Sequence, residues 1–202
     1  MAKTVALDTT RTQKATFAVQ LDGMTDIMFD RYAGDNKTVL EPFQRLYFAP
    51  GTSRVVLPSL NLMSFLSAQN TNSAPKRLLD SRSYRKTANA MLSFVSIGPS
   101  NIPFLRDGEP VEFGKLENDT DPVSGIYIHR SVARLKDGIP NPKERPVLPC
   151  PWSLAFELSI FPNKEIQEQQ VLNMIEQGGI ALGLGTFRGV FGKFNVSKWD
   201  KQ

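Results

Sequence analysis

The sequence has one cysteine and one histidine among its 202 residues, and both scarcities restrict the chemistry open to it. The single cysteine, Cys150, excludes an internal disulfide and a zinc cage built from several cysteines. A Ser-His-Asp or Cys-His nucleophile would have to recruit His129. Because His129 lies in the alternating run GIYIHRSVARL, we expect a structural strand residue. We therefore expect no catalytic residue, metal or cofactor.

Long apolar runs are also missing from the sequence. No apolar stretch approaches the ~20 residues of a membrane-spanning helix, and the N-terminal MAKTVALDTTRTQK lacks the apolar region of a signal peptide. One cysteine also suits a reducing compartment. We therefore expect a cytoplasmic protein with no membrane partner. Lys and Arg outnumber Asp and Glu by only 24 to 20, so any polyanion binding must come from local clusters of cations.

The first half of the sequence alternates between strand and helix patterns. Ala15–Leu21 has the alternation of a strand. After Pro58, apolar residues at 62, 65 and 66 follow helical spacing, and a second short helix is expected after Asp80, a capping residue. LSFVSIG then reads as a strand. This half therefore predicts strand, helix, strand.

The last part of the sequence repeats this order. SLAFELSI, after Pro151, predicts a strand, and a helix follows with a buried stripe at 171, 174 and 175. Gly178-Gly179 is expected to end that helix, because glycine accepts the left-handed conformation there. A strand through Phe194 closes the chain. The order predicts an α+β, ferredoxin-like (RRM-like) βαββαβ core formed by residues 1–98 and 151–202.

Residues 99–150 separate the second and third predicted core strands. The segment 98–150 holds eight of the fourteen prolines and shows no helical period. Prolines stiffen an extended chain, so residues 99–150 are expected to form a projecting arm. An ordinary proline-rich surface loop is the alternative. Its cations, which are candidates for contacts with a neighbouring molecule, are Arg130, Arg134, Lys143 and Arg145.

A glycine-rich segment, residues 178–193, carries six glycines together with Arg188 and Lys193. Glycine lets a backbone approach a phosphate chain closely, so Gly183, Gly185, Arg188 and Lys193 are candidate nucleic-acid contacts. The alternative is a tightly packed, bulged strand entry. The segment matches neither a Walker A loop nor a dinucleotide fingerprint, because Phe187 and Arg188 occupy positions where those motifs need glycine.

Residues 76–86, KRLLDSRSYRK, form the densest basic cluster. Paired cations with an aromatic residue suit a phosphate backbone and a stacked base, whereas a solvated helix face is the alternative. The candidate residues are Lys76, Arg77, Arg82, Tyr84, Arg85 and Lys86.

Two elements resemble the RAMP superfamily of CRISPR-associated RNA-binding proteins. The G-x-x-R-G-x-x-G-[KR]-F pattern at residues 185–194 is similar to the C-terminal glycine-rich loop of that family. Residues 54–68, RVVLPSLNLMSFLSA, resemble its "-IPGSSLKGxLR-" element, although Met63-Ser64 stands where Lys-Gly would be expected. The resemblance implies that Asn61 and Ser64 donate hydrogen bonds to a guide backbone.

The same resemblance implies a function. The chain would be a backbone subunit of a CRISPR-type ribonucleoprotein, polymerising along guide RNA without sequence preference, with copies of itself and other effector subunits as partners. Residues 99–150 would then resemble the thumb that reaches a neighbouring copy. A phage- or virus-type structural protein and a single-stranded DNA-binding or annealing protein remain the alternatives.

Some relatives cut target RNA with an acidic residue after the first strand. Asp26, Asp30 and Asp35 lie in the corresponding segment. Acidic residues are also common turn formers, and no second acid at metal-binding spacing accompanies them. We therefore expect a protein without catalytic activity.

Overall fold

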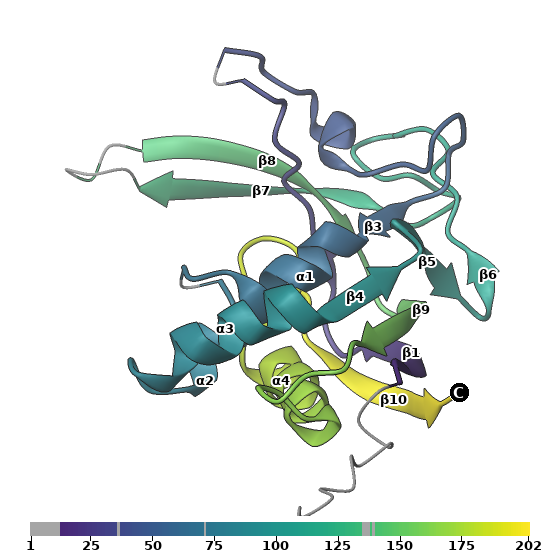
Figure 1. Cartoon of the computed structure of the whole chain (residues 1–202). Helices are drawn as coiled ribbons and strands as arrows, with labels where there is room; N and C mark the ends of the chain where they lie inside the picture. The colour runs from purple at the N-terminus through teal and green to yellow at the C-terminus, as the bar shows by residue number, and fades with distance from the viewer. Residues whose placement is uncertain (1–12, 36, 71, 135–137, 139) are drawn as a thin grey trace, which may run out of the picture.

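A computed structural model describes residues 13–35, 37–70, 72–134, 138 and 140–202 of the chain (Figure 1). The first twelve residues, where we expected no signal peptide, lie outside this part. Among the residues described, no helix is long and apolar enough to cross a membrane.

The chain alternates strands and helices in an α+β order. The strands are β1 (Ala15–Gly23), β2 (Ile27–Met28), β3 (Val56–Pro58), β4 (Val95–Gly98), β5 (Asn101–Arg106), β6 (Glu109–Pro110), β7 (Tyr127–Arg134), β8 (Pro140–Leu148), β9 (Ser153–Ile160) and β10 (Phe194–Lys201). The helices are the 3-10 helix η2 (Pro42–Arg45) and the α-helices α1 (Ser59–Ser67), α2 (Ala74–Leu78), α3 (Ser83–Phe94) and α4 (Glu168–Ala181).

The main sheet is antiparallel and has β1 and β9 at its centre. Its order is β10-β1-β9-β5-β3, with β4 also paired to β9 and β6 to β5. β4 and then β5 pair with successive parts of β9, so the chain follows one edge of β9 in two pieces, with a break at Pro99-Ser100. Alternate residues of β1 are fully or almost fully buried, which gives the sheet one apolar face.

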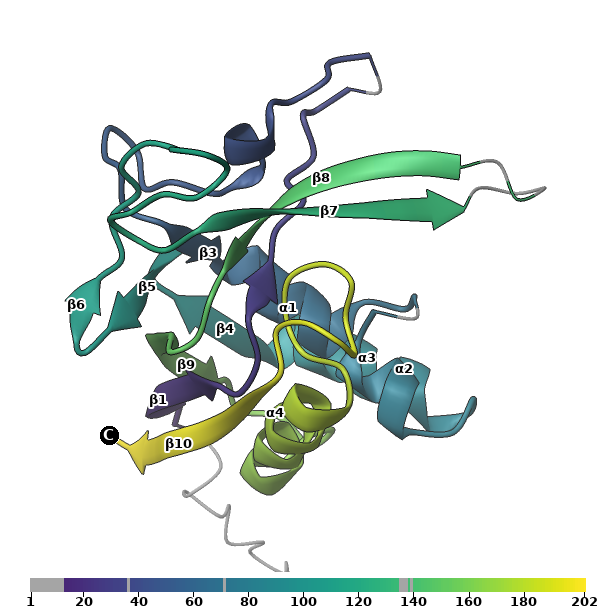
Figure 2. The ribbon, with the colours of Figure 1, turned by 180° about the vertical axis from the view of Figure 1, so that it is seen from behind.

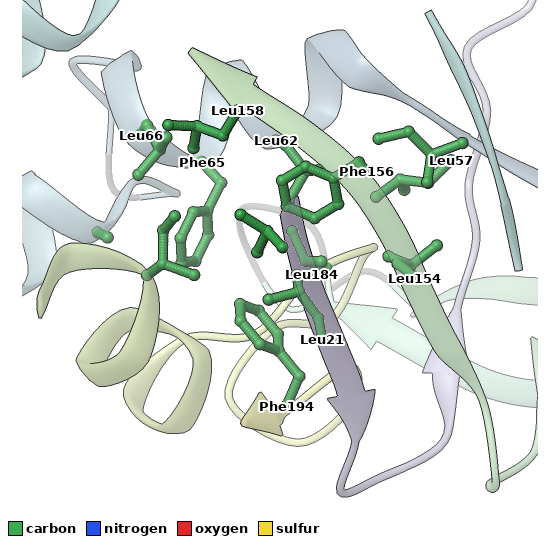
Figure 3. Close-up of a cluster of buried hydrophobic side chains, with 14 of the residues drawn as sticks. Leu21, Leu57, Leu62, Phe65, Leu66, Leu154, Phe156, Leu158, Leu184 and Phe194 are labelled. Carbon is green, nitrogen blue, oxygen red and sulfur yellow. The ribbon is translucent and has the colours of Figure 1, made fainter. Parts of the chain in front are cut away.

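Helices α1 and α4 cover that apolar face. Phe65 of α1 packs against Phe194 of β10 with ring centroids 5.8 Å apart. Leu21 of β1, Leu158 of β9 and Leu184, from the loop after α4, join them with no exposed surface (Figure 3). The glycine-rich segment is therefore anchored in the core.

The interior of α4 differs from the prediction at its glycines. Gly178 and Gly179 lie inside the helix and are buried, instead of ending it. A Cβ on Gly178 would lie 2.6 Å from the Cβ of Ala74 and 2.6 Å from Phe65. The missing side chain lets α2, which the sequence did not predict, pack against the last turns of α4. This packing brings Arg77 of α2 towards the loop that follows α4.

The projecting part of the chain is smaller than the arm predicted for residues 99–150. β5 lies in the main sheet, and its Ile102 and Phe104 are fully buried. Phe104 contacts Trp152 edge to face, with ring centroids 5.7 Å apart. The proline in NIPFLR hid the alternation of apolar residues that marks a strand, and the segment belongs to the hydrophobic core. The hairpin of β7 and β8 is the part that projects (Figure 1).

The β7–β8 hairpin forms a second sheet with β2, in the order β2-β8-β7. Pro140, Pro142 and Pro146 lie even numbers of positions apart in β8, so their peptide groups point to the same side of the strand. The carbonyl of Pro146 accepts a hydrogen bond from the N–H of Phe29 at 3.0 Å, so these peptide groups point away from β7. The prolines therefore face the outer edge of β8, where they remove no hydrogen bond from the pairing with β7.

Candidate nucleic-acid interface

The loop after α4, residues 182–193, is fixed by backbone hydrogen bonds. Leu184 N–H donates to the carbonyl of Gly192 at 2.9 Å, which closes the loop on itself. Thr186 N–H donates to the carbonyl of Met28 at 2.9 Å, which ties the loop to β2. Figure 2 shows this yellow loop between the β7–β8 hairpin and the segment that leads into α2. Backbone hydrogen bonds therefore hold the loop to itself and to β2.

The glycines of this loop serve two different purposes. Gly185 has a φ of +76°, and a Cβ there would lie 2.4 Å from the carbonyl oxygen of Met28. A Cβ on Gly183 would lie 2.7 Å from the carbonyl oxygen of Gly192. Both residues approach the protein's own backbone, which gives a packing reason for each glycine, and their predicted phosphate contacts stay predictions. Gly189, with a φ of +90° and no atom within 4 Å of its Cβ position, faces open space.

Arg188 joins this loop to the segment before α2. Its Nε donates to the carbonyl of Gly185 at 3.0 Å, and its Nη1 donates to the carbonyl of Asn72. Burial lowers the pKa of the guanidinium from its usual value, but an arginine stays charged at neutral pH. Guanidinium carries five N–H donors, so Arg188 keeps further donors for an anion.

A hollow of about 470 Å³ lies between α2 and the loop. It brings together Arg77 and Arg188, which the sequence predicted separately as phosphate contacts. Its lining residues are Asn72, Arg77, Ala181, Leu182, Gly185, Thr186, Phe187, Arg188 and Gly189. Two cations thus share one concave site.

A second hollow of about 170 Å³ shares three lining residues with the first one. Both hollows are lined by Gly185, Thr186 and Arg188, and the second also reaches Asn61 of α1 and Asp30. We call these two neighbouring hollows together the basic groove. The predicted contact Asn61 is therefore part of this groove.

Ser64 and Lys193 lie elsewhere. Ser64 is exposed on α1 and lines neither hollow of the groove. The Lys193 N–H donates to Thr25 Oγ1 at 2.9 Å, and its carbonyl accepts from Met24 N–H at 2.7 Å. Lys193 thus joins the loop to the end of β1, and it also lines neither hollow. The two cations of the glycine-rich segment are not brought together.

Tyr84 has a role different from the predicted base stacking. The residue is 5% exposed, and the Lys76 ammonium lies 4.1 Å from its ring centroid. Arg85 Nε donates to the phenol oxygen at 3.0 Å, and this hydrogen bond is the main cause that lowers the pKa of Tyr84. The phenol therefore organises Lys76 and Arg85 at the junction of α2 and α3.

The remaining cations of the 76–86 cluster are free to meet an external anion. Arg77, Arg82 and Lys86 are exposed and form no ion pair with any residue that the structure describes. Asp80, just before α3, accepts hydrogen bonds from the N–H groups of Arg82 and Ser83, at 2.8 and 2.9 Å. Of the three free cations, Arg77 lines the groove.

Two cations of the hairpin are already paired within the chain. Arg130 binds Asp119 at 2.5 Å and Glu144 at 3.0 Å. Arg145 binds Asp30 at 2.8 Å. These carboxylates neutralise two of the charges that were predicted to contact a neighbour.

Two cations of the hairpin differ from this pattern. Lys143 forms no ion pair with the described part of the chain and lines a shallow hollow of about 200 Å³ beside Val132. Arg134 ends β7 opposite Pro140, and its side chain lies outside what the structure describes. Lys143 is therefore the hairpin cation best placed for an outside contact.

Each of the three acidic residues after β1 accepts hydrogen bonds from other groups of the chain. Asp26 accepts from the hydroxyl of Tyr127 at 3.1 Å and from the N–H of Cys150 at 3.0 Å. Burial, together with this contact to Asp26, raises the pKa of Tyr127 to about 12. Asp30 bridges two arginines, at 2.5 and 2.8 Å. Asp35 caps a turn by accepting from Thr38.

The residues that the structure describes contain no group of three or more His, Cys, Asp or Glu able to hold a metal ion. His129, predicted as a structural strand residue, lies in β7 with its ring edge-on to Phe191, 5.5 Å between centroids.

Phe187 is a residue of the groove that sequence reasoning missed. It is 58% exposed and lines the larger hollow beside Arg77 and Arg188. Its signal in the sequence is an aromatic side chain directly before an arginine in a glycine-rich stretch. The sequence could not show that the loop places Phe187 opposite α2.

Comparison with known proteins yields a similarity of fold. No family model and no curated protein matches the chain. The fold is similar to a chain in the cryo-EM structure of the type III-B Cmr-beta bound to cognate target RNA, with a TM-score of 0.52 and 10% sequence identity. The match covers 94% of this chain and 61% of the other, so this chain spans less than two thirds of its structural relative.

Proposed function

We propose that the protein is a non-enzymatic, RNA-binding backbone subunit of a CRISPR-type ribonucleoprotein. The observation that carries this proposal is the basic groove. Arg77 and Arg188, 111 positions apart in the sequence, line one hollow. Their guanidinium groups suit phosphate recognition, because the planar fork of arginine matches the oxygens of a phosphate. Asn61 adds an amide donor farther along the groove.

The strand order supports the RAMP-type, ferredoxin-like plan. In that plan the first and last core strands are neighbours, and the third core strand lies between the first and the second. Here β10 pairs with β1, β1 with β9, and β9 with β4. α1 to α3 precede β4, and α4 connects β9 to β10. The similarity to a Cmr-beta chain, a protein solved with target RNA, points the same way.

Binding in such a groove would be tolerant of sequence. The groove offers guanidinium and amide donors, and contacts of this kind to phosphates carry no direct base information. Affinity would then come largely from counterion release and would fall as salt increases. This is the behaviour required of a subunit that coats a guide strand along its length.

The β7–β8 hairpin is the part we assign to a neighbouring copy. It projects from the main sheet (Figure 1), and Val132 near its end is 61% exposed. Lys143 on the paired strand adds a cation without an ion-pair partner in the described chain. Replacing residues 131–143 by a short turn should leave the main sheet folded and shorten RNA-dependent assemblies in size-exclusion chromatography.

The experiment that tests the proposal compares Arg77→Ala with Lys164→Ala. Both side chains are exposed, but Lys164 precedes α4 whereas the groove follows it, and a helix of fourteen residues is about 21 Å long. Binding of a short, mixed-sequence single-stranded RNA would be measured by fluorescence polarisation at several salt concentrations.

Arg77→Ala should weaken binding by about 1–3 kcal/mol and reduce the salt slope by about one unit. Lys164→Ala should bind like the wild type. Equal affinity of the wild type and Arg77→Ala, or an affinity independent of salt, would contradict the proposal. A single-stranded DNA of the same sequence separates an RNA-binding subunit from a DNA-binding protein.

A further inference from the structure

Phe187 adopts a backbone conformation that is rare for an aromatic residue. Its φ is +52°, in the left-handed region, where bulky side chains are genuine outliers. Strain of this kind persists only where the surrounding structure imposes it, and it clusters at binding sites. The loop hydrogen bonds on both sides of Phe187, at Thr186 and Gly189, supply that constraint.

The strained conformation exposes the ring instead of burying it. Phe187 is 58% exposed, although the same loop buries Leu182 and Leu184 almost completely. Its nearest aromatic contact is Phe191, at 6.0 Å between ring centroids with a tilt of 38°. A loop that can bury two leucines thus holds a phenyl ring in solvent, which costs hydrophobic free energy unless a ligand covers the ring.

Charge near the ring indicates what that ligand is. Phe187 shares the larger hollow with Arg77 on α2 and Arg188 next to it in the sequence. The hollow measures about 470 Å³, within the roughly 300–1,000 Å³ that is usual for ligand sites. An aromatic platform between cations is the arrangement that single-stranded nucleic-acid sites use, because bases stack while phosphates pair with the cations.

We propose that Phe187 is a stacking platform for one base of a single-stranded nucleic acid, whose adjoining phosphates are bound by Arg77 and Arg188. This inference rests on the proposed function. It adds the position of one base, because phosphate contacts alone do not define where a base lies. Stacking is tolerant of sequence because every base has a π-face. The platform would therefore fix the spacing of the strand without selecting a base.

Three substitutions at position 187 test the stacking role. Phe187→Ala should weaken binding of the mixed-sequence RNA by about 5- to 150-fold. Phe187→Leu should weaken it similarly, because leucine keeps the apolar volume and loses the π-face. Phe187→Trp should retain binding, and RNA should quench its fluorescence. The wild type gives the background fluorescence of the two native tryptophans. Trp152 is 2% exposed, and Trp199 is stacked on Phe17 at 4.9 Å between ring centroids.

A fourth variant separates binding from folding. Asparagine tolerates the left-handed region far better than phenylalanine. Phe187→Asn should therefore melt at or above the wild-type temperature, while its affinity for RNA falls as in Phe187→Ala. A structural role for the ring predicts the opposite result, with a lower melting temperature and unchanged affinity per folded molecule.

The outcomes distinguish this inference from the proposed function. If Arg77→Ala loses affinity while Phe187→Ala and Phe187→Leu bind like the wild type, the groove binds RNA and the stacking role is wrong. If the wild type itself binds neither RNA nor single-stranded DNA, the proposed function fails and the platform with it. If Phe187→Ala alters only the oligomeric state in size-exclusion chromatography, the ring is a protein contact, which also overturns the inference.

Discussion

Arg188 donates a hydrogen bond to the carbonyl of Asn72, a residue 116 positions earlier in the chain. The contact connects the loop after α4 to the segment that starts α2. Since Arg188 also donates to Gly185 within its own loop, one side chain fixes the shape of the loop and its position relative to Arg77. Stability and the proposed RNA binding should therefore both depend on this residue.

Arg188→Ala should therefore affect both properties. Loss of the two hydrogen bonds from a charged donor should lower the free energy of unfolding by about 1–3 kcal/mol. Affinity for single-stranded RNA should fall by a similar amount, about 1–3 kcal/mol, because a phosphate contact disappears. Thermal melting and fluorescence polarisation on the same preparation measure the two effects.

Arg188→Lys is the matched control for charge. It keeps the cation but not the fork that reaches Gly185 and Asn72 together. It should lose stability like the alanine variant and keep part of the affinity. An alanine variant that melts earlier yet binds RNA fully would remove Arg188 from the interface.

Tyr84 should behave as a structural residue. Tyr84→Ala removes a nearly buried ring and should lower the free energy of unfolding by about 3–5 kcal/mol. Tyr84→Phe keeps the ring beneath the Lys76 ammonium and loses only the hydrogen bond from Arg85, so a change of about 1 kcal/mol is expected. Neither variant should change RNA affinity per folded molecule. A folded Tyr84→Phe or Tyr84→Ala protein with weakened binding would restore the stacking role predicted from the sequence.

Gly185 and Gly189 offer a paired test of the loop. Both have positive φ, but a Cβ meets the Met28 carbonyl at Gly185 and open space at Gly189. Gly189→Ala should cost about 1–2 kcal/mol from backbone strain alone. Gly185→Ala adds a steric clash and should cost about 2–5 kcal/mol. Denaturant unfolding measures both values, and equal costs would mean that the close approach to β2 contributes nothing.

Asp121 binds the segment before β7, so the stability of the protein in acid tests the contribution of its carboxylate. Burial alone would raise its pKa, but hydrogen bonds from Ser124, Gly114 and Val123 outweigh burial and lower the pKa below the usual 3.8. A lowered carboxyl pKa stabilises the fold above the unfolded-state pKa, and this contribution is lost as the pH falls through the folded-state pKa. Wild-type stability should therefore decrease on acidification below about pH 4.

Asp121→Asn is the comparison for this effect. The amide cannot titrate, so the variant should be less stable than the wild type at neutral pH, and the difference should narrow as the pH falls. Urea unfolding at pH values from 7 down to about 3 covers the carboxyl range. A difference that is constant with pH would show that the charge of Asp121 does not contribute to the fold.

The sequence predicted the helices more reliably than their ends. The stripe Val171, Met174 and Ile175 identified α4 because apolar periodicity reflects one buried face. The glycines at 178 and 179 were read as a stop signal, yet they allow Ala74, Phe65 and Phe194 to approach the helix. A local sequence pattern does not indicate which distant segment packs against the helix. The same limitation hid α2 and the place of β5 in the main sheet.

The site was predicted in pieces. Arg77 and Arg188 were each identified from charge and neighbouring residues, but their common hollow depends on the packing of α2 against α4. The roles of Tyr84 and Arg145 depended on partners in other segments, Lys76 and Asp30, that the sequence could not identify. Charge clustering finds candidate cations, and tertiary structure decides which of them remain unpaired.

The prolines of β8 limit how another chain can pair with the β7–β8 hairpin. Between Pro140 and Pro146 the outer edge of β8 has no N–H at its proline positions, so a strand from another molecule finds too few donors there to extend the sheet. Hairpins brought close together at high concentration would not merge into a continuous cross-strand ladder. Contacts made through side chains dissociate more readily than a shared sheet, so in the proposed assembly along RNA a misplaced copy would be able to leave and bind again.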